Sequence, residues 1–474
     1  MSESTVKKNL TGREKAAYGL GAVGKDMVYM LSASYVLYYF QDIMGVSAVA
    51  MGVILMAARI FDAFNDPIMG VITAKTKTKW GKFRPWLFIG TILNAVVLYV
   101  MFSAPPTLTA GGLVAYAAVF YILWGVTYTM MDIPYWSMIP AFTEGGKERE
   151  NLTTLARSCA GVGSALITII TMKIVVMLGQ GNEHAGFSKF ALIIAVLFIA
   201  AETITCLAIK EKSTVEMKTA SVGDMFKALV HNDQAMVIVL TIVLVNTSVY
   251  ITSNLVIYFF KYDFGGATWY NAYTLFNMFG GAMQILSMII LFPLLRRKLN
   301  TIQIFYTGIG MAVLGYAALI VLAFATKMSN VFILFVPGFF IFAAVGLLTV
   351  LTTVFLANTV DYGEIKTNSR EESVIFSMQT FVVKLASGVA ALAASLTLAI
   401  FHIQKDSGEG AAQQVLQIAE SSRVGLRLSM TIIPIVLLVI AALVFRKKYI
   451  LTDAKIEELS AEIRARRALE GTAD

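Results

Sequence analysis

Long apolar segments recur along the whole chain and decide what it can fold into. About twelve of them, each 20–30 residues long, follow one another with polar connections between them. A helix rises about 1.5 Å per residue, so each segment can cross the roughly 30 Å hydrocarbon core of a bilayer. Backbone groups in lipid must bond within their own segment, which makes these segments helices. The sequence therefore predicts an all-α membrane protein with twelve transmembrane helices, at residues 17–41, 46–73, 84–104, 110–138, 152–179, 185–209, 235–262, 268–294, 300–325, 329–359, 374–401 and 425–446.

The composition excludes an ordinary soluble protein, because hydrophobic residues make up 57% of the chain and charged residues only 14%. The polar stretch 1–15 precedes the first span without a cleavage site, so we expect no cleavable signal peptide. Cys159 and Cys206 both fall within predicted spans, which argues against a disulfide framework. The formal net charge of +8 is gathered in a few connections and does not indicate nucleic-acid binding.

The Lys and Arg clusters occupy every second connection. If the spans alternate in direction, all clusters lie on one side, whereas opposite connections such as 103–111 and 179–188 are nearly free of them. The positive-inside rule then places both termini in the cytoplasm. The clusters lie at residues 7–15, 75–84, 147–149, 210–212, 296–298, 366–370 and 446–448.

A polar connection at residues 210–234 separates six spans from six. This 6+6 pseudo-symmetric layout, with both termini on one side, is typical of the major facilitator superfamily. The internal repeat is faint, since the basic stretch after the second span has only a weak counterpart after the eighth. We predict four parts: a six-helix bundle at 1–209, a central cytoplasmic loop at 210–234, a second six-helix bundle at 235–446 and a cytoplasmic tail at 447–474.

The second apolar segment contains Asp62, Asn65 and Asp66. The two acids are one helical turn apart and therefore share a face of the helix. An acid at mid-membrane costs about 2.5–3.5 kcal/mol on insertion scales, so the pair needs a compensating partner. Arg59 can neutralise one acid, which would make the pair structural, but one Arg cannot balance two. The pattern indicates a cation site.

The first and fourth spans carry further intramembrane charges. Lys25 and Asp26 are adjacent, so we expect each to find partners on other helices; an interfacial pair that snorkels to the headgroups is the alternative. Tyr128, Asp132 and Trp136 recur every four residues on one stripe. A carboxylate between two rings suits a sugar, because C–H faces stack on a ring while hydroxyls donate to the acid. Packing alone is the alternative for the rings.

Later charges are fewer. Arg157 enters the fifth span, and Lys384 lies well inside the eleventh. Intramembrane ionisable groups usually mark ion or substrate pathways, so Lys384 is the main candidate in the second half to face the acids of the first. The connections after the fourth and tenth spans mix both signs, and we expect a cytoplasmic gating network of salt bridges there, formed by Arg149, Asp361, Glu364 and Arg370.

Five segments carry a family resemblance: AARIFDAFNDPIMG, KTKWGKFRPW, YTMMDIPYWSMIP, KEREN and VDYGEIKTNSREES. They resemble the signature segments of the glycoside–pentoside–hexuronide:cation symporters, most closely the melibiose permease and lactose/raffinose carrier branch. The resemblance implies a coupling-cation site formed by Asp62, Asn65, Asp66 and Thr129. It also implies a galactoside pocket in which the C-terminal half takes part, lined by Asp26, Tyr128, Asp132, Trp136, Arg157, Thr380 and Lys384. We assign Lys25 and Gln379, the sequence neighbours of two of these positions, to the same pocket.

One position departs from the pattern, because melibiose permeases carry a Trp in the tenth span where this chain has Thr349. The change removes a stacking surface and leaves the sugar open. We predict a secondary active symporter that couples inward sodium or proton movement to uptake of a small glycoside, most readily an α-galactoside such as melibiose or raffinose. The alternative is a pentoside or glucuronide:proton symporter, although a sugar acid favours a more cationic pocket.

We expect no cofactor and no metal beyond the coupling ion, which is Na+ or else H+ or Li+. Sodium is favoured because the four cation-site residues supply several oxygens, whereas proton coupling needs only one acid. The resemblance implies a multi-pass protein of the bacterial cytoplasmic (inner) membrane. We expect it to act as a monomer in the lipid bilayer, with no nucleic-acid partner.

Two other classes of protein remain as alternatives. A membrane-embedded enzyme is disfavoured because His184, His231 and His402 lie in or near loops and no nucleophile constellation occurs within the spans. A passive channel is disfavoured because it needs no paired coupling acids.

Overall fold

The chain is helical throughout the part that the computed structural model describes, residues 10–139, 146–210, 227, 232–266, 268–326, 330–367, 372–403 and 418–470. Within those ranges only an isolated bridge between Thr78 and Gly81 has strand character. The chain divides into two compact units between Thr219 and Ala220, inside the predicted 210–234 connection. The functions assigned to the two halves stay predictions.

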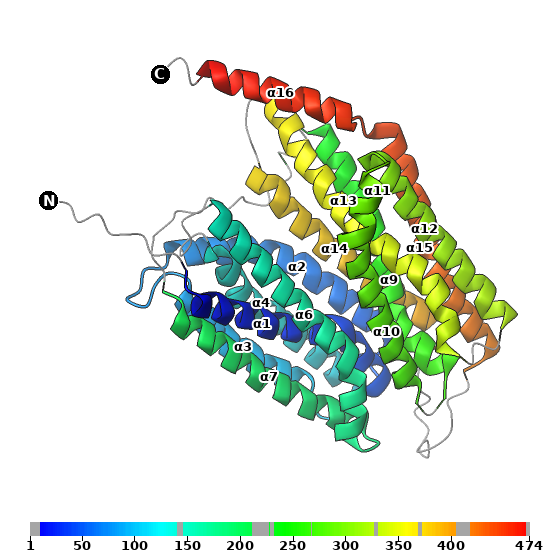
Figure 1. Cartoon of the computed structure of the whole chain (residues 1–474). Helices are drawn as coiled ribbons and strands as arrows, with labels where there is room; N and C mark the ends of the chain where they lie inside the picture. The colour runs from blue at the N-terminus through cyan, green and yellow to red at the C-terminus, as the bar shows by residue number, and fades with distance from the viewer. Residues whose placement is uncertain are drawn as a thin grey trace. The chain divides into compact units, whose positions relative to one another are not determined.

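The first unit is built from long helices that pack along α1 and α4 (Figure 1). α1 packs along α6 and α7, α4 packs along α2 and α3, and α3 also contacts α7. Close approach needs glycine at one of these interfaces, because a Cβ on Gly163 of α6 would overlap the backbone of Val23. The elements are α1 (Gly12–Tyr38), η1 (Tyr39–Ile43), α2 (Ala48–Lys75), α3 (Arg84–Met101), α4 (Ala110–Ser137), α6 (Gly146–Gly179) and α7 (Glu183–Ala208).

The second unit repeats this kind of packing. α9 lies along α14 and α15, α12 along α13 and α15, and α10 along α13. The elements are α9 (Asp233–Tyr258), η2 (Phe259–Phe264), α10 (Trp269–Leu286), η3 (Ser287–Leu291), α11 (Phe292–Arg296), α12 (Thr301–Ala325), η4 (Val331–Leu334), α13 (Phe335–Thr367), α14 (Glu372–Ile400), α15 (Glu420–Lys448) and α16 (Asp453–Glu470).

The apolar lengths and surfaces are those of membrane-spanning helices. Among the residues searched, which are those described, eleven helical segments are long and apolar enough to cross a membrane. α1 is not one of them, although its 27 residues have the length of a span and cover most of the predicted segment 17–41. Large apolar side chains such as Leu207, Ile289 and Val321 are more than 60% exposed, as expected for contact with lipid. The predicted all-α architecture of membrane-length helices is confirmed.

α1 and α9 end in the same way. Each passes into a π-helix, η1 or η2, and then reaches a glycine with positive φ, 72° at Gly45 and 70° at Gly265. Only glycine adopts this conformation without strain. The aromatic residues before the two turns also correspond, at 38–40 and 258–260. This correspondence between the two halves of the chain is clearer than the one between the basic stretches after the second and eighth spans.

The tail helix α16 is attached at its first residue. The carboxylate of Asp453 lies 2.6 Å from Arg296 Nη2 and accepts a hydrogen bond of 2.5 Å from Thr301 Oγ1. Burial alone would raise the pKa of Asp453, but the hydrogen bonds from Thr301 and Arg296 outweigh it and hold that pKa below its usual value. α16 also packs against α13, so the tail begins as a docked helix.

Candidate functional site

Asp62 of α2 has a cationic partner on its own helix. Arg59 Nη1 lies 3.3 Å from Asp62 Oδ2, and both side chains are buried. The guanidinium also lies 5.9 and 6.0 Å from the ring centroids of Tyr29 and Tyr121. A buried charge needs such a set of partners. Arg59 therefore compensates Asp62, as the structural interpretation of this acid requires.

Asp66 meets a different partner, because its Oδ1 accepts a 2.9 Å hydrogen bond from Thr129 Oγ1 of α4. Asn65 lies beside it in sequence, and its Nδ2 is buried with no hydrogen-bond partner in the described part of the chain. An amide presents either oxygen or nitrogen by rotation, so Asn65 can also direct its carbonyl oxygen to this position. Carboxylate, amide and hydroxyl oxygens of α2 and α4 are thus available to hold a monovalent cation.

Gly125 is what lets α4 approach the Asp62 carboxylate. A Cβ on Gly125 would lie 2.6 Å from Asp62 Oδ1, a separation that real Cβ atoms do not show. The resemblance assigned no role to this glycine. The available signal was a Gly in the middle of the helix, next to Trp124, and it pointed to close packing without naming a partner.

Lys25 of α1 is the centre of the second cluster of predicted residues. Its Nζ lies 2.7 Å from Asp132 Oδ1, 3.0 Å from Asp26 Oδ2 and 3.2 Å from the hydroxyl of Tyr128. Lys25 is only 3% exposed, so these groups replace its hydration. As expected, Lys25 and Asp26 each find partners on other helices, and Lys25 in addition contacts Asp26 itself. The long lysine stem lets the ammonium group turn back to its neighbour while it also reaches α4.

Trp136 and Arg157 complete this cluster. Trp136 Nε1 donates to Asp132 Oδ1 at 3.1 Å, and the Arg157 guanidinium of α6 stacks 3.9 Å from the centroid of a Trp136 ring. Ser164, which the sequence did not single out, contributes a 3.4 Å hydrogen bond to Asp26 Oδ1. The arrangement presents carboxylates, cationic donors and an indole from three helices, and these are the groups that bind a polyhydroxylated ring.

The sugar-site residues predicted in the C-terminal half of the chain belong to the second unit. Gln379 Nε2 of α14 donates a 3.4 Å hydrogen bond to Thr353 Oγ1 of α13, and Lys384 is partly buried. Thr349 is exposed and donates back to the carbonyl of its own helix at Val345. The side chain of Thr380 lies outside the described residues.

The predicted gating network is covered only in part. Asp361 and Glu364 are half-buried near the end of α13, whereas the side chains of Arg149 and Arg370 lie outside the described residues. The same end of α13 carries an ion pair that the sequence analysis missed, in which Lys366 Nζ lies 2.5 Å from Asp233. Tyr362 also donates to Asp233 at 3.1 Å, so α13 is tied to the start of α9.

Apolar helices of membrane length with buried ionic clusters indicate a helical membrane transporter, and the comparisons with known proteins confirm the predicted twelve-helix major facilitator fold. The fold resembles the crystal structure of a bacterial homolog to the human lysosomal transporter Spinster, in an inward-facing and unoccupied conformation. That likeness has a TM-score of 0.65 at 13% identity and covers 92% of this chain and 95% of the other. The chain belongs to the family of MFS/sugar transport proteins, whose sequence profile matches residues 17–453.

Two relatives illustrate the family. The raffinose carrier protein of Pediococcus pentosaceus is 26% identical over 94% of this chain and 70% of its own length. The isoprimeverose transporter of Lactiplantibacillus pentosus is 28% identical over 83% of this chain and 82% of its own length. The resemblance to the glycoside–pentoside–hexuronide:cation symporters is confirmed, and the protein is a membrane transporter and not an enzyme.

Proposed function

We propose that this protein is a sodium-coupled symporter that takes up a small α-galactoside by alternating access. The observation that carries the proposal is the spacing on α4. Thr129 donates to Asp66 in the candidate cation site, and Asp132, less than one turn further along, binds Lys25 in the candidate sugar site. A cation that moves Thr129 must therefore also move Asp132, which links the two sites through one rigid helix.

Sodium is favoured over a proton by the oxygens of α2 and α4. Asp66, Asn65 and Thr129 come from two helices, and a sodium ion needs several oxygens whereas a proton needs one acid. Asp62, already compensated by Arg59, contributes a further oxygen through Oδ1, the atom that faces Gly125.

The sugar is proposed from the chemistry of the Lys25 cluster. Two carboxylates suit a neutral sugar with several hydroxyl donors, and Arg157 is the cation stacked on the indole. A glucuronide, which brings its own carboxylate, would be repelled by Asp26 and Asp132. The pentoside alternative is kept because one relative is named as an isoprimeverose transporter.

We further propose both termini in the cytoplasm of a bacterial inner membrane, a monomeric protein, and gating by the ionic residues at the end of α13. The orientation rests on the basic connections, which the positive-inside rule assigns to the cytoplasm.

Uptake into right-side-out membrane vesicles tests the proposal. Labelled melibiose, raffinose, a xyloside and a glucuronide are offered with an inward sodium gradient, with an equal potassium gradient, and with a proton gradient alone. We expect uphill accumulation of an α-galactoside that needs sodium and collapses when an ionophore dissipates the gradient. Uptake that only equilibrates would instead indicate a channel, and accumulation with protons alone would overturn the sodium assignment.

A further inference from the structure

Glu202 is a buried acid that neither candidate site uses. It lies in α7, has 0% of its surface exposed, and neither carboxyl oxygen has a hydrogen-bond partner among the described residues. It is also the sole acid in the predicted span 185–209. A polar group buried without a partner is costly, so its presence calls for an explanation.

The carboxyl group occupies a space that α1 leaves open. Gly21 of α1 has no side chain at this point, and a Cβ there would lie 3.0 Å from Glu202 Oε2 and would overlap Thr205 Oγ1. Glu202 Oε2 and Thr205 Oγ1, both of α7, therefore lie close to the same point of Gly21. The Thr205 hydroxyl donates to the carbonyl of Ala17 at 2.9 Å, so its hydrogen is not directed to Glu202.

The nearby phenols are committed elsewhere too. Tyr18 and Tyr135 stack with centroids 4.4 Å apart, and each hydroxyl donates to the backbone carbonyl of the other residue, at 2.5 and 2.6 Å. Neither phenol donates to Glu202. Within the described part of the chain, no side chain therefore supplies Glu202 with the hydrogen bonds that an ionised carboxylate requires.

Gly21, which faces Glu202, lies one helical turn before Lys25 on α1, so the candidate sugar site supplies the charges of α1 that lie next to Glu202 along that helix, Lys25 and Asp26. Lys25 already pairs with Asp26 and Asp132, so an ionised Glu202 would be a third carboxylate beside one ammonium group. An unpaired charge is costly to bury, and a proton bound to the carboxylate removes that charge and its cost. Other titratable groups that the helices packed here place near this point include Tyr18 of α1, Tyr135 of α4, Cys159 of α6, Cys206 of α7 and Arg84 of α3, which donates to the carbonyl of Cys206.

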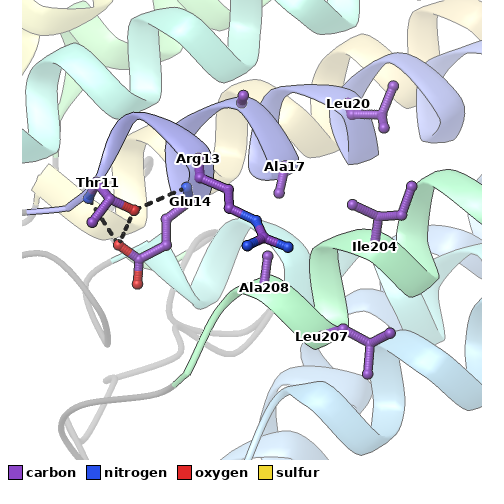
Figure 2. A pocket seen from close by; sticks show the side chains of 9 residues that line it. Thr11, Arg13, Glu14, Ala17, Leu20, Ile204, Leu207 and Ala208 are labelled. Carbon is purple, nitrogen blue, oxygen red and sulfur yellow. Dashed lines mark hydrogen bonds between the residues drawn. The ribbon is translucent and has the colours of Figure 1, made fainter.

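A cavity of about 720 Å³ follows the same interface of α1 and α7 (Figure 2). Figure 2 shows Arg13 extending from α1 toward Ala208 of α7, while Glu14 is turned back to Thr11. Ala17, whose carbonyl accepts from Thr205, lines this cavity. The Thr205 hydroxyl, bonded to Ala17 of the cavity wall, lies near the same point of Gly21 as Glu202, and its oxygen can accept a hydrogen bond from a protonated Glu202.

We propose that Glu202 is a proton-binding site, reached from the cavity between α1 and α7 and linked to the sugar site through Lys25. The step is the addition of one proton to the carboxylate and its later release. When the proton leaves, the new carboxylate competes with Asp26 and Asp132 for Lys25. Sugar and proton then change each other's affinity by the same factor. Only this link rests on the proposed function; the proton site does not.

Infrared difference spectroscopy of the purified full-length protein tests the site directly. The probe is the carbonyl stretch of a protonated carboxylic acid, followed as the pH is raised. We expect Glu202→Gln to remove one such band at neutral pH and to unfold within a few degrees of wild type. Glu183→Gln is the matched control, because its carboxylate begins the same helix and accepts from Tyr38 at 2.6 Å; it should keep the band. An unchanged band in Glu202→Gln would show an ionised Glu202 and overturn the proposal.

The link to the sugar is measured separately, as sugar affinity against pH at saturating sodium. We expect wild-type affinity to change over the pH range in which the Glu202 band titrates and Glu202→Gln affinity to be flat there. Equal pH dependence in both proteins would overturn the link while the infrared result still decides the proton site. If no glycoside binds at all, the proposed function fails and the infrared result is unaffected.

Discussion

The α-carbon of Gly125 on α4 faces Asp62 of α2 so closely that a methyl group there would lie 2.6 Å from Asp62 Oδ1. The other carboxylate oxygen is held by Arg59 at 3.3 Å, so Asp62 can yield only by leaving its ionic partner. The contact therefore sets the position of an acid in the candidate cation site.

We expect Gly125→Ala to lower sodium affinity about tenfold or more, since displacing a charged hydrogen-bond partner costs about 1.5–3 kcal/mol. The measurement is the sodium concentration that half-maximally enhances sugar binding. Gly111→Ala is the control on the same helix, because nothing lies within 4 Å of its added Cβ. A sodium dependence in Gly125→Ala that matches Gly111→Ala would contradict the role of this contact.

Asp66→Asn should leave sugar binding measurable but make it indifferent to sodium. The substitution removes the charge that attracts the cation and keeps an oxygen for the hydrogen bond from Thr129. By linkage, a sugar that no longer responds to sodium also no longer tightens sodium binding. Titrating sugar affinity from low to high sodium checks this. Wild-type affinity that ignores sodium and follows pH alone would identify a proton site.

Asp132→Ala should abolish detectable sugar binding while sodium binding survives. Asp132 Oδ1 accepts from both Lys25 and Trp136, so its loss frees both donors and removes an acceptor for sugar hydroxyls. Affinity should fall tenfold or more, corresponding to about 1.5–3 kcal/mol. Asp26→Ala is expected to behave alike, whereas Ser164→Ala, which loses a 3.4 Å hydrogen bond, should change affinity little. Normal sugar affinity in both Asp variants would remove them from the pocket.

Arg427 and Asp263 form a bidentate ion pair in the second unit, with two parallel hydrogen bonds of 2.7 Å between α15 and the end of η2. The Asp263 side chain is fully buried and that of Arg427 is 12% exposed. Breaking a buried pair costs about 3–5 kcal/mol because one charge is left unpaired. We expect Arg427→Met to lower the unfolding temperature clearly, and Asp263→Leu combined with Arg427→Met to recover much of it. A double variant as unstable as the single one would contradict the explanation that the unpaired charge of Asp263 causes the loss of stability.

The helical repeat explains which residues could be predicted to lie together. Tyr128, Asp132 and Trp136 share a stripe of α4, and the Trp136–Asp132 hydrogen bond follows from their spacing of four residues. The Arg59–Asp62 pair follows from a spacing of three in the same way. The repeat of glycine-terminated π-helices at the ends of α1 and α9 was also readable in the sequence, as aromatic residues followed by a glycine. We missed it because we compared loops and not the ends of helices.

The sequence by itself determined the class of protein, because segment length and the absence of water in a bilayer leave the backbone only the helix. It also determined which charges must be explained, since each acid in an apolar segment is costly. Only the tertiary structure decided the partners: Lys25 with Asp132, Thr129 with Asp66, and Glu202 with no donor above Gly21. Periodicity relates residues within one helix, whereas contacts between helices depend on the relative rotation and height of two helices. Those are set by how whole faces pack, down to the single glycines that allow close approach.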